Sequence, residues 1–337
     1  MVQYDVGIVG MGSYVPDRIL TNYDLEKMVD TSDEWIASRT GIKERRICQE
    51  DQATSDLAVI AARRALVNAG LTPQDIDLII VATISPDMLF PSTSCLVQAA
   101  LAAGHAAAFD LSAGCSGFVY ALVTGAQFVQ TGLYNRVLVI GADALSRLTD
   151  WKDRRTCVLF GDGAAAAIVS RVPTGYGMQA SILRADGSGQ SSLYMPAGGS
   201  RRPANLETVQ NREHFIKMEG PEVFKFAVKA MQEATKKVLE KAQLTLADIK
   251  LFVPHQANIR IIEASLNRMG VEAERVFLNV DKYGNTSAAS VGIALDEALQ
   301  AGRISDGDYI LLVGFGAGLT WGSLLLRWYG GELNAER

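Results

Sequence analysis

Short apolar runs alternate with amphipathic segments along most of the chain. Residues 78–84 and 137–140 are almost continuous runs of Leu, Ile, Val and Ala, as expected for strands buried on both faces of a sheet. Apolar residues between 224 and 238 recur at steps of three or four, which predicts a helix with one buried face. Similar patterns predict strands at 5–9, 251–253 and 309–313 and helices at 58–70 and 116–130. This alternation indicates an α/β fold.

The pattern repeats at an offset of 173 residues. Residues 71–78 read Leu-Thr-Pro-Gln-Asp-Ile-Asp-Leu and residues 244–251 read Leu-Thr-Leu-Ala-Asp-Ile-Lys-Leu, with five of eight positions identical. Two further pairs of segments align at the same offset and in the same order. We therefore predict two similar α/β halves, 1–173 and 174–337.

Composition and charge narrow the class of protein. The chain has 337 residues, of which 48% are hydrophobic and 20% charged, as in an ordinary folded protein. It carries 37 acidic and 32 basic residues, a net charge of −5, which argues against nucleic-acid binding. Apolar runs fall short of the roughly 20 residues that span a bilayer, and the N-terminus lacks a signal pattern. We expect a cytoplasmic protein without membrane insertion.

Cysteine and histidine are rare, so the list of candidate reactive residues is short. The four cysteines are not spaced as in metal or redox motifs, and there are only three histidines, so we expect no metal site. Cys115 lies where a predicted strand ends and the apolar helix 116–130 begins, and the positive end of a helix favours a thiolate. At the repeat offset it aligns with Ala288, so only the first half carries a thiol. A buried structural cysteine is the alternative for Cys115. We expect Cys48, Cys95 and Cys157 to be structural.

Two residues of the second half are candidate partners for this thiol. His255 directly follows the predicted strand 251–253, at the end where open α/β sheets place their sites. Asn285 lies in a Gly-Asn turn that enters a second apolar helix. An imidazole and an amide can donate hydrogen bonds to charge that develops in a transition state. A hydrogen-bonded core histidine and an ordinary turn asparagine remain the alternatives.

Glycine-rich segments and one long loop complete the pattern. Gly7, Gly10 and Gly12 follow a strand but do not form the dinucleotide-binding fingerprint. Residues 314–318 are followed by a second strand-like run, so a bend that exposes backbone N–H groups to an oxyanion is favoured over a phosphate loop. Residues 184–220 break the periodicity and are either a lid over a site or a solvated insertion.

Five motifs resemble β-ketoacyl-acyl carrier protein synthase III. The segments Asp-Leu-Ser-Ala-Gly-Cys115-Ser-Gly-Phe, Pro-His255-Gln-Ala-Asn and Gly-Asn285-Thr-Ser-Ala-Ala-Ser are similar to the Cys-His-Asn set of that family. Residues 31–42 and 314–322 also match, so the resemblance covers nearly the whole chain. It implies the thiolase fold, with two duplicated α/β halves forming five layers, αβαβα, around buried central helices.

The resemblance also implies an acyltransferase reaction. An acyl-CoA primer, acetyl-CoA or another short one, would acylate Cys115. Malonyl-acyl carrier protein would then lose CO2, and its carbanion would attack the thioester to give 3-oxoacyl-carrier protein, which initiates fatty-acid synthesis. Both thioesters are substrates, so no cofactor is implied. The alternatives are a secondary-metabolite ketosynthase or acyltransferase with the same triad and another acceptor, and a non-catalytic CoA-binding protein.

Further residues are assigned by the same resemblance. The backbone N–H groups of Cys115 and Ala317 would hold an oxyanion, although the family commonly has Gly at position 317. Residues 31–34 predict a capping box that starts a short helix, with Trp35 and Arg39 on one face. The implied CoA contacts are Thr31, Trp35, Arg39, Arg154 and Asn258; the acyl pocket includes Phe315 and, across a homodimer interface, Phe90; Lys225, Arg260 and Arg268 would bind the acyl carrier protein.

Overall fold

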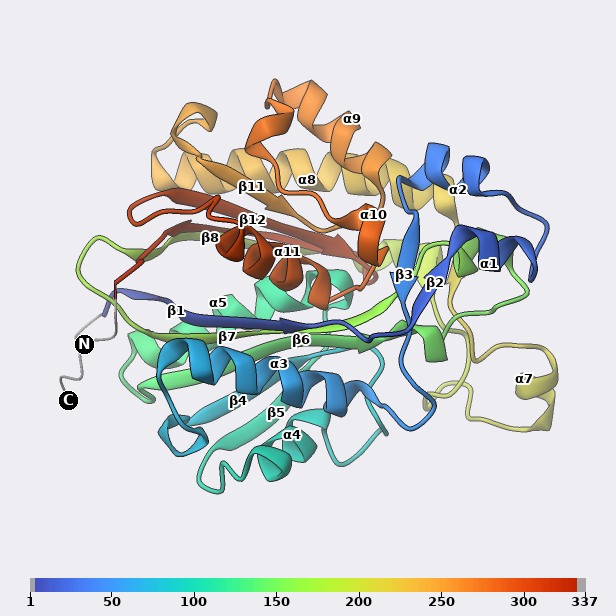
Figure 1. The fold of residues 1–337 in the computed structure, drawn as a ribbon, viewed down its shortest axis with the longest axis horizontal. Coiled ribbons are helices and arrows are strands. Elements are labelled where there is room, and N and C mark those ends of the chain that lie inside the picture. The colour runs from blue at the N-terminus through green and yellow to red at the C-terminus, as the bar shows by residue number, and fades with distance from the viewer. Residues whose placement is uncertain (1–3, 332–337) are drawn as a thin grey trace.

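Two β-sheets and three layers of helices make up the fold of the computed structural model, which describes residues 4–331 (Figure 1). The larger sheet has the strand order β1-β7-β6-β4-β5 and the smaller sheet has the order β11-β12-β13-β8. Their strands are β1 Val6–Tyr14, β4 Leu78–Ala82, β5 Ala107–Leu111, β6 Arg136–Ala144, β7 Asp162–Arg171, β8 Gly177–Ala185, β11 Leu251–Pro254, β12 Tyr309–Gly316 and β13 Thr320–Arg327.

Short pieces complete the list of elements. Two small sheets pair β2 Ile19–Thr21 with β3 Glu44–Arg46, and β9 Leu193–Tyr194 with β10 Lys217–Met218. The helices are α1 Asn22–Glu26, α2 Asp33–Thr40, α3 Thr54–Ala69, α4 Thr93–Leu101, α5 Gly117–Gln130, α6 Arg154–Cys157, α7 Leu206–Gln210, α8 Gly220–Ala242, α9 Ile259–Met269, α10 Val280–Tyr283 and α11 Ala289–Gln300.

The larger sheet is buried on both faces, as its apolar strands predict. β4 is parallel to β5 and β6, whereas β7 and β1 continue the sheet antiparallel. Successive side chains of a strand point to opposite faces. Along β7, Ala164 and Ala166 pack in the core beneath α3, whereas Ala165 packs against Ala289 and Ile293 of α11. Small residues therefore let helices cover both sides of this strand closely.

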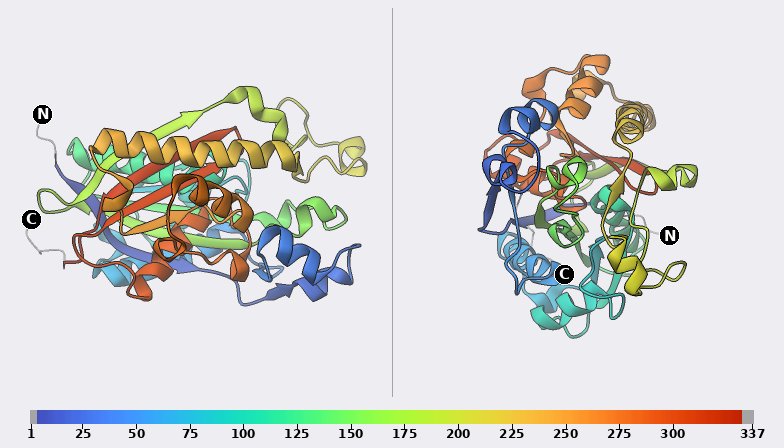
Figure 2. Two further views of the ribbon diagram at one scale, coloured as in Figure 1. Left: turned by 90° about the horizontal axis from the view of Figure 1, so that it is seen from above. Right: turned by 90° about the vertical axis from the view of Figure 1, so that its right-hand side faces the viewer.

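The helices α5 and α11 lie between the two sheets, and α8 and α9 cover the outer face of the smaller sheet (Figures 1 and 2). Phe118 of α5 is fully buried, and a Cβ added at Gly292 of α11 would lie 3.1 Å from its ring. The predicted five-layer thiolase fold is confirmed. The exact division at residues 173 and 174 stays a prediction; β7 ends at Arg171 and β8 begins at Gly177.

Helix α2 begins one residue later than the predicted capping box implies, so that prediction is wrong. Ser32 is the N-cap, and its hydroxyl accepts a hydrogen bond from the backbone N–H of Trp35 at 3.1 Å. Ser32 has the extended backbone that points a cap side chain at the helix start. Thr31 instead has a buried hydroxyl with no hydrogen-bond partner among residues 4–331.

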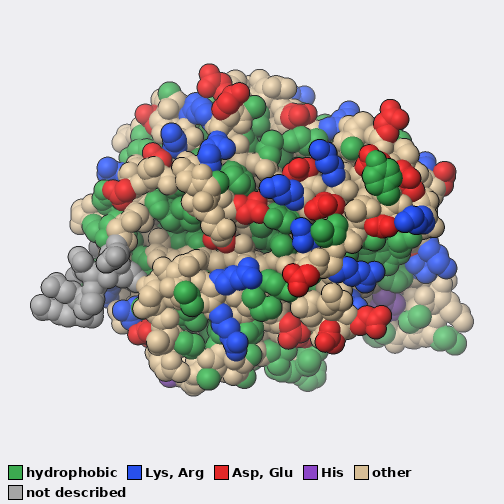
Figure 3. All heavy atoms as spheres, viewed as in Figure 1, with side chains coloured by type: hydrophobic (Ala, Val, Ile, Leu, Met, Phe, Trp, Pro, Cys, Tyr) green, Lys and Arg blue, Asp and Glu red, His purple; other side chains and the backbone are tan. Residues whose placement is uncertain are grey.

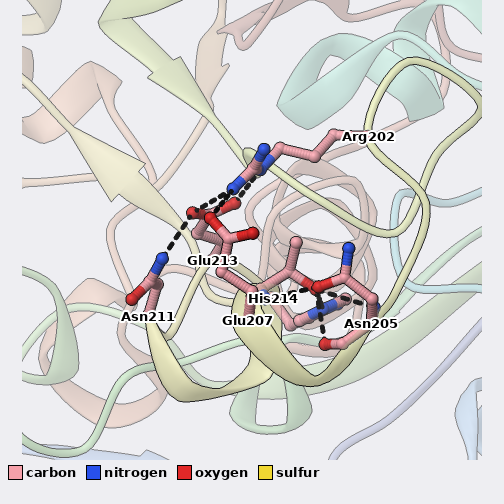
Figure 4. A network of polar contacts seen from close by, with 7 residues as sticks. Arg202, Asn205, Glu207, Asn211, Glu213 and His214 are labelled. Carbon is pink, nitrogen blue, oxygen red and sulfur yellow. Dashed lines mark hydrogen bonds and ion pairs between the residues drawn. The ribbon is translucent and has the colours of Figure 1, made fainter.

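Residues 186–219 form a structured excursion at the end of the molecule opposite its termini (Figures 1 and 2). Arg202 forms ion pairs with Glu207 and Glu213 (Figure 4). Thr208 forms hydrogen bonds with Asn205 and His214. Within this segment lie a 3₁₀ turn, η4 Gly187–Ser192, then β9, α7 and β10. The middle of the excursion is thus held by its own polar contacts.

Candidate active site

One cavity of about 530 Å³ contains all three predicted reactive side chains, Cys115, His255 and Asn285. Cys115 lies in the 3₁₀ turn η2 (Gly114–Ser116) between β5 and α5, His255 follows β11, and Asn285 follows α10. Their exposed fractions are only 5%, 1% and 7%. Cys115 follows β5 of the larger sheet and His255 follows β11 of the smaller sheet. Two chain segments 140 residues apart (255 − 115) therefore meet where strands of the two sheets end.

The backbone of residues 316 and 317 lies directly against the nucleophile. A Cβ added at Gly316 would lie 2.7 Å from the backbone nitrogen of Cys115, and one added at Gly114 would lie 3.0 Å from that of Ala317. Only glycine allows such an approach. Ala317 itself does not have a positive φ, so the alanine found at this position introduces no backbone strain.

Burial raises the pKa of the Cys115 thiol from 9.0 to about 12. A helix terminus contributes at most about 2 kcal/mol, which corresponds to a pKa change of about 1.5. The loss of hydration is therefore the larger effect, with the nearby Asp143 carboxylate acting in the same direction. Burial thus acts against the start of the helix at this sulfur, and the expectation that the helix favours a thiolate stays a prediction.

His255 is held in a neutral state and in a single orientation. Its backbone N–H donates to Val313 O at 2.8 Å, and its ring stands edge-on to Phe315 with the centroids 5.1 Å apart. Its Nδ1 forms a hydrogen bond with the Ser290 hydroxyl. Burial lowers the pKa of His255 from 6.5 to about 3, so the imidazole is uncharged at neutral pH.

Asn285 is fixed through its backbone and its side-chain oxygen. Its backbone N–H donates to Leu159 O at 2.8 Å, and its carbonyl accepts from Gly161 N at 3.0 Å. Its Oδ1 accepts from the backbone N–H of Ser287 at 2.9 Å. Since the oxygen is occupied, the amide NH2 is the group that Asn285 offers to the cavity. The preceding Gly284 has φ +62° and ψ −152°, a conformation that the turn requires and that favours glycine.

Trp35 and Arg39 line the same cavity at a more exposed position. The guanidinium groups of Arg39 and Arg154 lie 5.0 and 5.4 Å from the Trp35 ring centroid. Arg154 also donates to Asp30 O at 2.7 Å and does not line the cavity, whereas Arg155 does. An aromatic ring flanked by cations is suited to a planar, anionic ligand.

The other predicted site residues divide into two groups. Asn258, Arg260 and Phe315 line the cavity, and Asn258 caps α9 by accepting from Arg260 N at 2.9 Å. The remaining predicted residues are not among the described residues that line it: Thr31, Phe90, Lys225, Arg268 and Ala317. Lys225 pairs with Glu222 at 2.9 Å, and Arg268 lies two turns along α9 from Arg260.

Three buried polar residues behind the site were not predicted from the sequence. Asp143 accepts a hydrogen bond from Ala288 N at 3.1 Å and from the hydroxyls of Thr83 and Ser85. The other two are Ser287 and Ser290, in the segment that follows Asn285. An acidic residue inside the otherwise apolar run 137–144 is the one signal that could have revealed Asp143. Burial raises the pKa of its carboxyl.

Five layers around two central helices make up the thiolase fold. Within that fold, a single cysteine that shares its cavity with a histidine and an asparagine is the arrangement of condensing enzymes that transfer acyl groups. Among residues 4–331, no group of three or more His, Cys, Asp or Glu side chains is placed to hold a metal ion. None of the helices within that range combines the length and hydrophobicity required to cross a bilayer.

Comparison with known proteins identifies the family. Two sequence profiles, described as 3-oxoacyl-[acyl-carrier-protein (ACP)] synthase III and its C-terminal part, match residues 109–187 and 239–328. The β-ketoacyl-[acyl-carrier-protein] synthase III of Caldanaerobacter subterraneus subsp. tengcongensis is 63% identical over 322 residues, which cover 96% of this chain and 97% of that protein.

Solved structures agree with this assignment. The synthase III structures from Thermus thermophilus and Aquifex aeolicus have TM-scores of 0.90 and 0.89 at 50% and 49% identity. Each match covers 96% of this chain and 100% of the solved chain. The chain belongs to the β-ketoacyl-[acyl-carrier-protein] synthase III family and is a condensing acyltransferase.

Proposed function

We propose that Cys115, His255 and Asn285 together catalyse the condensation of a short acyl-CoA with malonyl-acyl carrier protein, which initiates fatty-acid synthesis. The observation that carries this proposal is the one cavity that contains all three side chains. The products are 3-oxoacyl-acyl carrier protein, CO2 and CoA. The reaction requires no cofactor, because both thioesters are substrates.

Cys115 accepts the acyl group in the first stage. Its sulfur attacks the carbonyl carbon of acyl-CoA, the bond from that carbon to the CoA sulfur breaks, and the thiol proton leaves with CoA as its thiol. The backbone N–H groups of Cys115 and Ala317 are the proposed donors to the carbonyl oxygen while it carries negative charge. Because burial raises the pKa of this thiol, we place the loss of its proton within the acylation step itself.

His255 and Asn285 act in the second stage. The bond from the malonyl Cα to its carboxylate breaks, CO2 leaves, and the electron pair passes to the thioester oxygen as an enolate. Neutral His255 and the NH2 group of Asn285 donate hydrogen bonds to that oxygen. The Cα then attacks the acyl group on Cys115, and the cysteine leaves as a thiolate that regains a proton.

This division of roles predicts different losses for the three residues. Cys115→Ser should abolish both acylation and condensation. His255→Ala and Asn285→Ala should slow condensation by about 10²- to 10⁴-fold while acylation by acyl-CoA survives. Mass spectrometry of the protein after incubation with acyl-CoA measures acylation, and formation of labelled 3-oxoacyl-acyl carrier protein measures condensation. Normal turnover by Cys115→Ser would refute the proposed nucleophile, and loss of acylation in all three variants would refute the separation of stages.

Binding roles for CoA and the carrier protein follow from the cavity mouth. We propose that the adenine of CoA stacks on Trp35, since Arg39 and Arg154 already flank that ring. Acidic and basic side chains are interspersed on the face shown in Figure 3, so an acidic carrier protein requires a local basic site. Arg260, which lines the cavity and is exposed, is the proposed site together with Lys225 of α8 and Arg268 of α9.

A homodimer in the cytoplasm is the proposed state of the enzyme. Leu89 and Phe90 are 81% and 84% exposed, next to the half-exposed Met88, and such a run favours burial against a second chain. All four cysteines are free, which fits a reducing compartment. Sedimentation should show a dimer that Leu89→Glu weakens; a monomeric wild type would refute this assembly.

A further inference from the structure

Ser290 lies against the edge of the His255 ring that points away from the cavity. It is in the first turn of α11, and both residues are buried, with exposed fractions of 2% and 1%. The Ser290 hydroxyl and Nδ1 of His255 form a hydrogen bond. Nε2, on the opposite edge of the ring, is left for the cavity that His255 lines together with Cys115 and Asn285.

The neighbours of the hydroxyl decide the direction of this hydrogen bond. The backbone N–H of Gln256 donates to Ser290 Oγ at 3.4 Å. Gln256 is itself fixed, because its side chain donates to Pro254 O and Phe277 O and accepts from Asn279 N. The serine oxygen therefore already accepts a hydrogen, and its own hydrogen has Nδ1 as its acceptor within residues 4–331. The reverse direction would leave a buried hydroxyl hydrogen unpaired, which is unfavourable.

A neutral imidazole carries one hydrogen, on either Nδ1 or Nε2. If Nδ1 accepts from Ser290, the hydrogen is on Nε2, where it can be donated to a substrate carbonyl. We propose that Ser290 is a positioning residue that keeps His255 in this Nε2–H form. The inference deepens the proposed function, since it rests on the role of His255 as a donor to the enolate oxygen.

The consequence differs between the two stages of the reaction. An imidazole with its hydrogen on Nε2 cannot also accept the Cys115 proton at Nε2, so acylation does not depend on Ser290. Condensation does, because the enolate oxygen requires a donor at that nitrogen. Loss of the hydroxyl should therefore affect the second stage and spare the first.

The form of the ring can be measured directly in the wild-type protein. The chain has only three histidines, so a ¹⁵N spectrum of histidine-labelled enzyme at neutral pH is simple, and His255→Ala assigns the His255 signals. We expect Nδ1 to show the shift of an acceptor nitrogen and Nε2 that of a nitrogen bearing hydrogen. The opposite assignment in the wild type would overturn the proposal, whatever the variants do.

Variants then link the ring form to the chemistry. Ser290→Ala should give a mixture of both ring forms and slow condensation about tenfold, less than the loss of the imidazole itself, with acylation unchanged. Ser290→Thr keeps a hydroxyl and should restore both the spectrum and the rate. Ser265→Ala is the control, since it removes another buried serine hydroxyl, one that donates to Ile261 O on α9, and it should change neither.

Two outcomes separate this inference from the proposed function. Equal losses of condensation in Ser290→Ala and Ser290→Thr, with the ring form unchanged, would overturn the role of the hydroxyl while leaving His255 as the donor. Normal condensation by His255→Ala would refute the proposed function, yet the ¹⁵N spectrum would still report the ring form that Ser290 sets.

Discussion

Single residues in the cavity owe their protonation states to burial more than to neighbouring charges. Burial raises the pKa of Cys115 to about 12 and lowers that of His255 to about 3, so both groups are neutral over the whole physiological range. The sequence identified both residues from their places after strands. It could not predict their pKa values, because the groups that exclude water, such as Phe315, come from a different part of the chain.

The buried neutral histidine predicts a specific acid sensitivity. Between pH 6.5 and about 3, His255 binds a proton in the unfolded chain but not in the folded one. Stability should therefore fall as the pH falls through this range, by at most about 1.4 kcal/mol per pH unit from this group. Urea unfolding at several pH values should show a smaller loss for His255→Gln than for the wild type. Parallel curves for the two proteins would contradict the assignment of a buried neutral ring.

At the scale of elements, the starts of helices supply much of the site. The turn η2 leading into α5 carries Cys115, the segment before α11 carries Asn285, and Asn258 caps α9. Strand and helix types were predictable because apolar periodicity is local. The start of α2 was misplaced by one residue, since Thr31 and Ser32 are both residue types that cap helices. In the structure Ser32 has the extended backbone of a cap and accepts the hydrogen bond.

The basic groups on α8 and α9 predict a salt-dependent interaction. Arg260→Glu should weaken use of the carrier protein severalfold at low salt and leave the KM for acyl-CoA nearly unchanged. Lys225→Glu should have a smaller effect, because Glu222 already pairs with Lys225. Steady-state kinetics with each substrate varied in turn measure both constants.

A matched charge reversal elsewhere on α8 controls for the change in net charge. Lys237→Glu, further along α8, should leave both constants unchanged. Equal losses for acyl-CoA and for the carrier protein in Arg260→Glu would show that this arginine does not select the carrier protein.

Over the whole molecule, the two sheets share one core through α5 and α11. The repeat in the sequence predicted this architecture, because both halves carry the same alternation of strands and helices. It could not predict the cavity, whose shape depends on contacts between segments far apart, nor the excursion at 186–219, where polar residues make their own network. The roles of Phe90 and Arg268 stay predictions for the same reason, since neither lines the cavity of this chain.

The shared core predicts a large cost for removing its central aromatic ring. Phe118→Ala should lower the free energy of unfolding by about 3–5 kcal/mol, a fall in Tm of about 5 °C for a chain of this length. Val67→Ala on α3, where the side chain is 77% exposed, should change stability by less than about 0.5 kcal/mol. Thermal unfolding followed by circular dichroism measures both, and similar Tm values for the two variants would contradict a single core.

The position of the cavity also means that a bound substrate should stabilise the fold. Cys115 follows a strand of the larger sheet, whereas His255 follows a strand of the smaller one. A ligand that contacts both residues therefore links the two sheets. Unfolding must release that ligand, and a ligand at 100 times its Kd adds about 2.7 kcal/mol to the free energy of unfolding. Bound acyl-CoA should therefore stabilise the enzyme against unfolding. The enzyme without substrate should be the form that heat and proteases inactivate fastest.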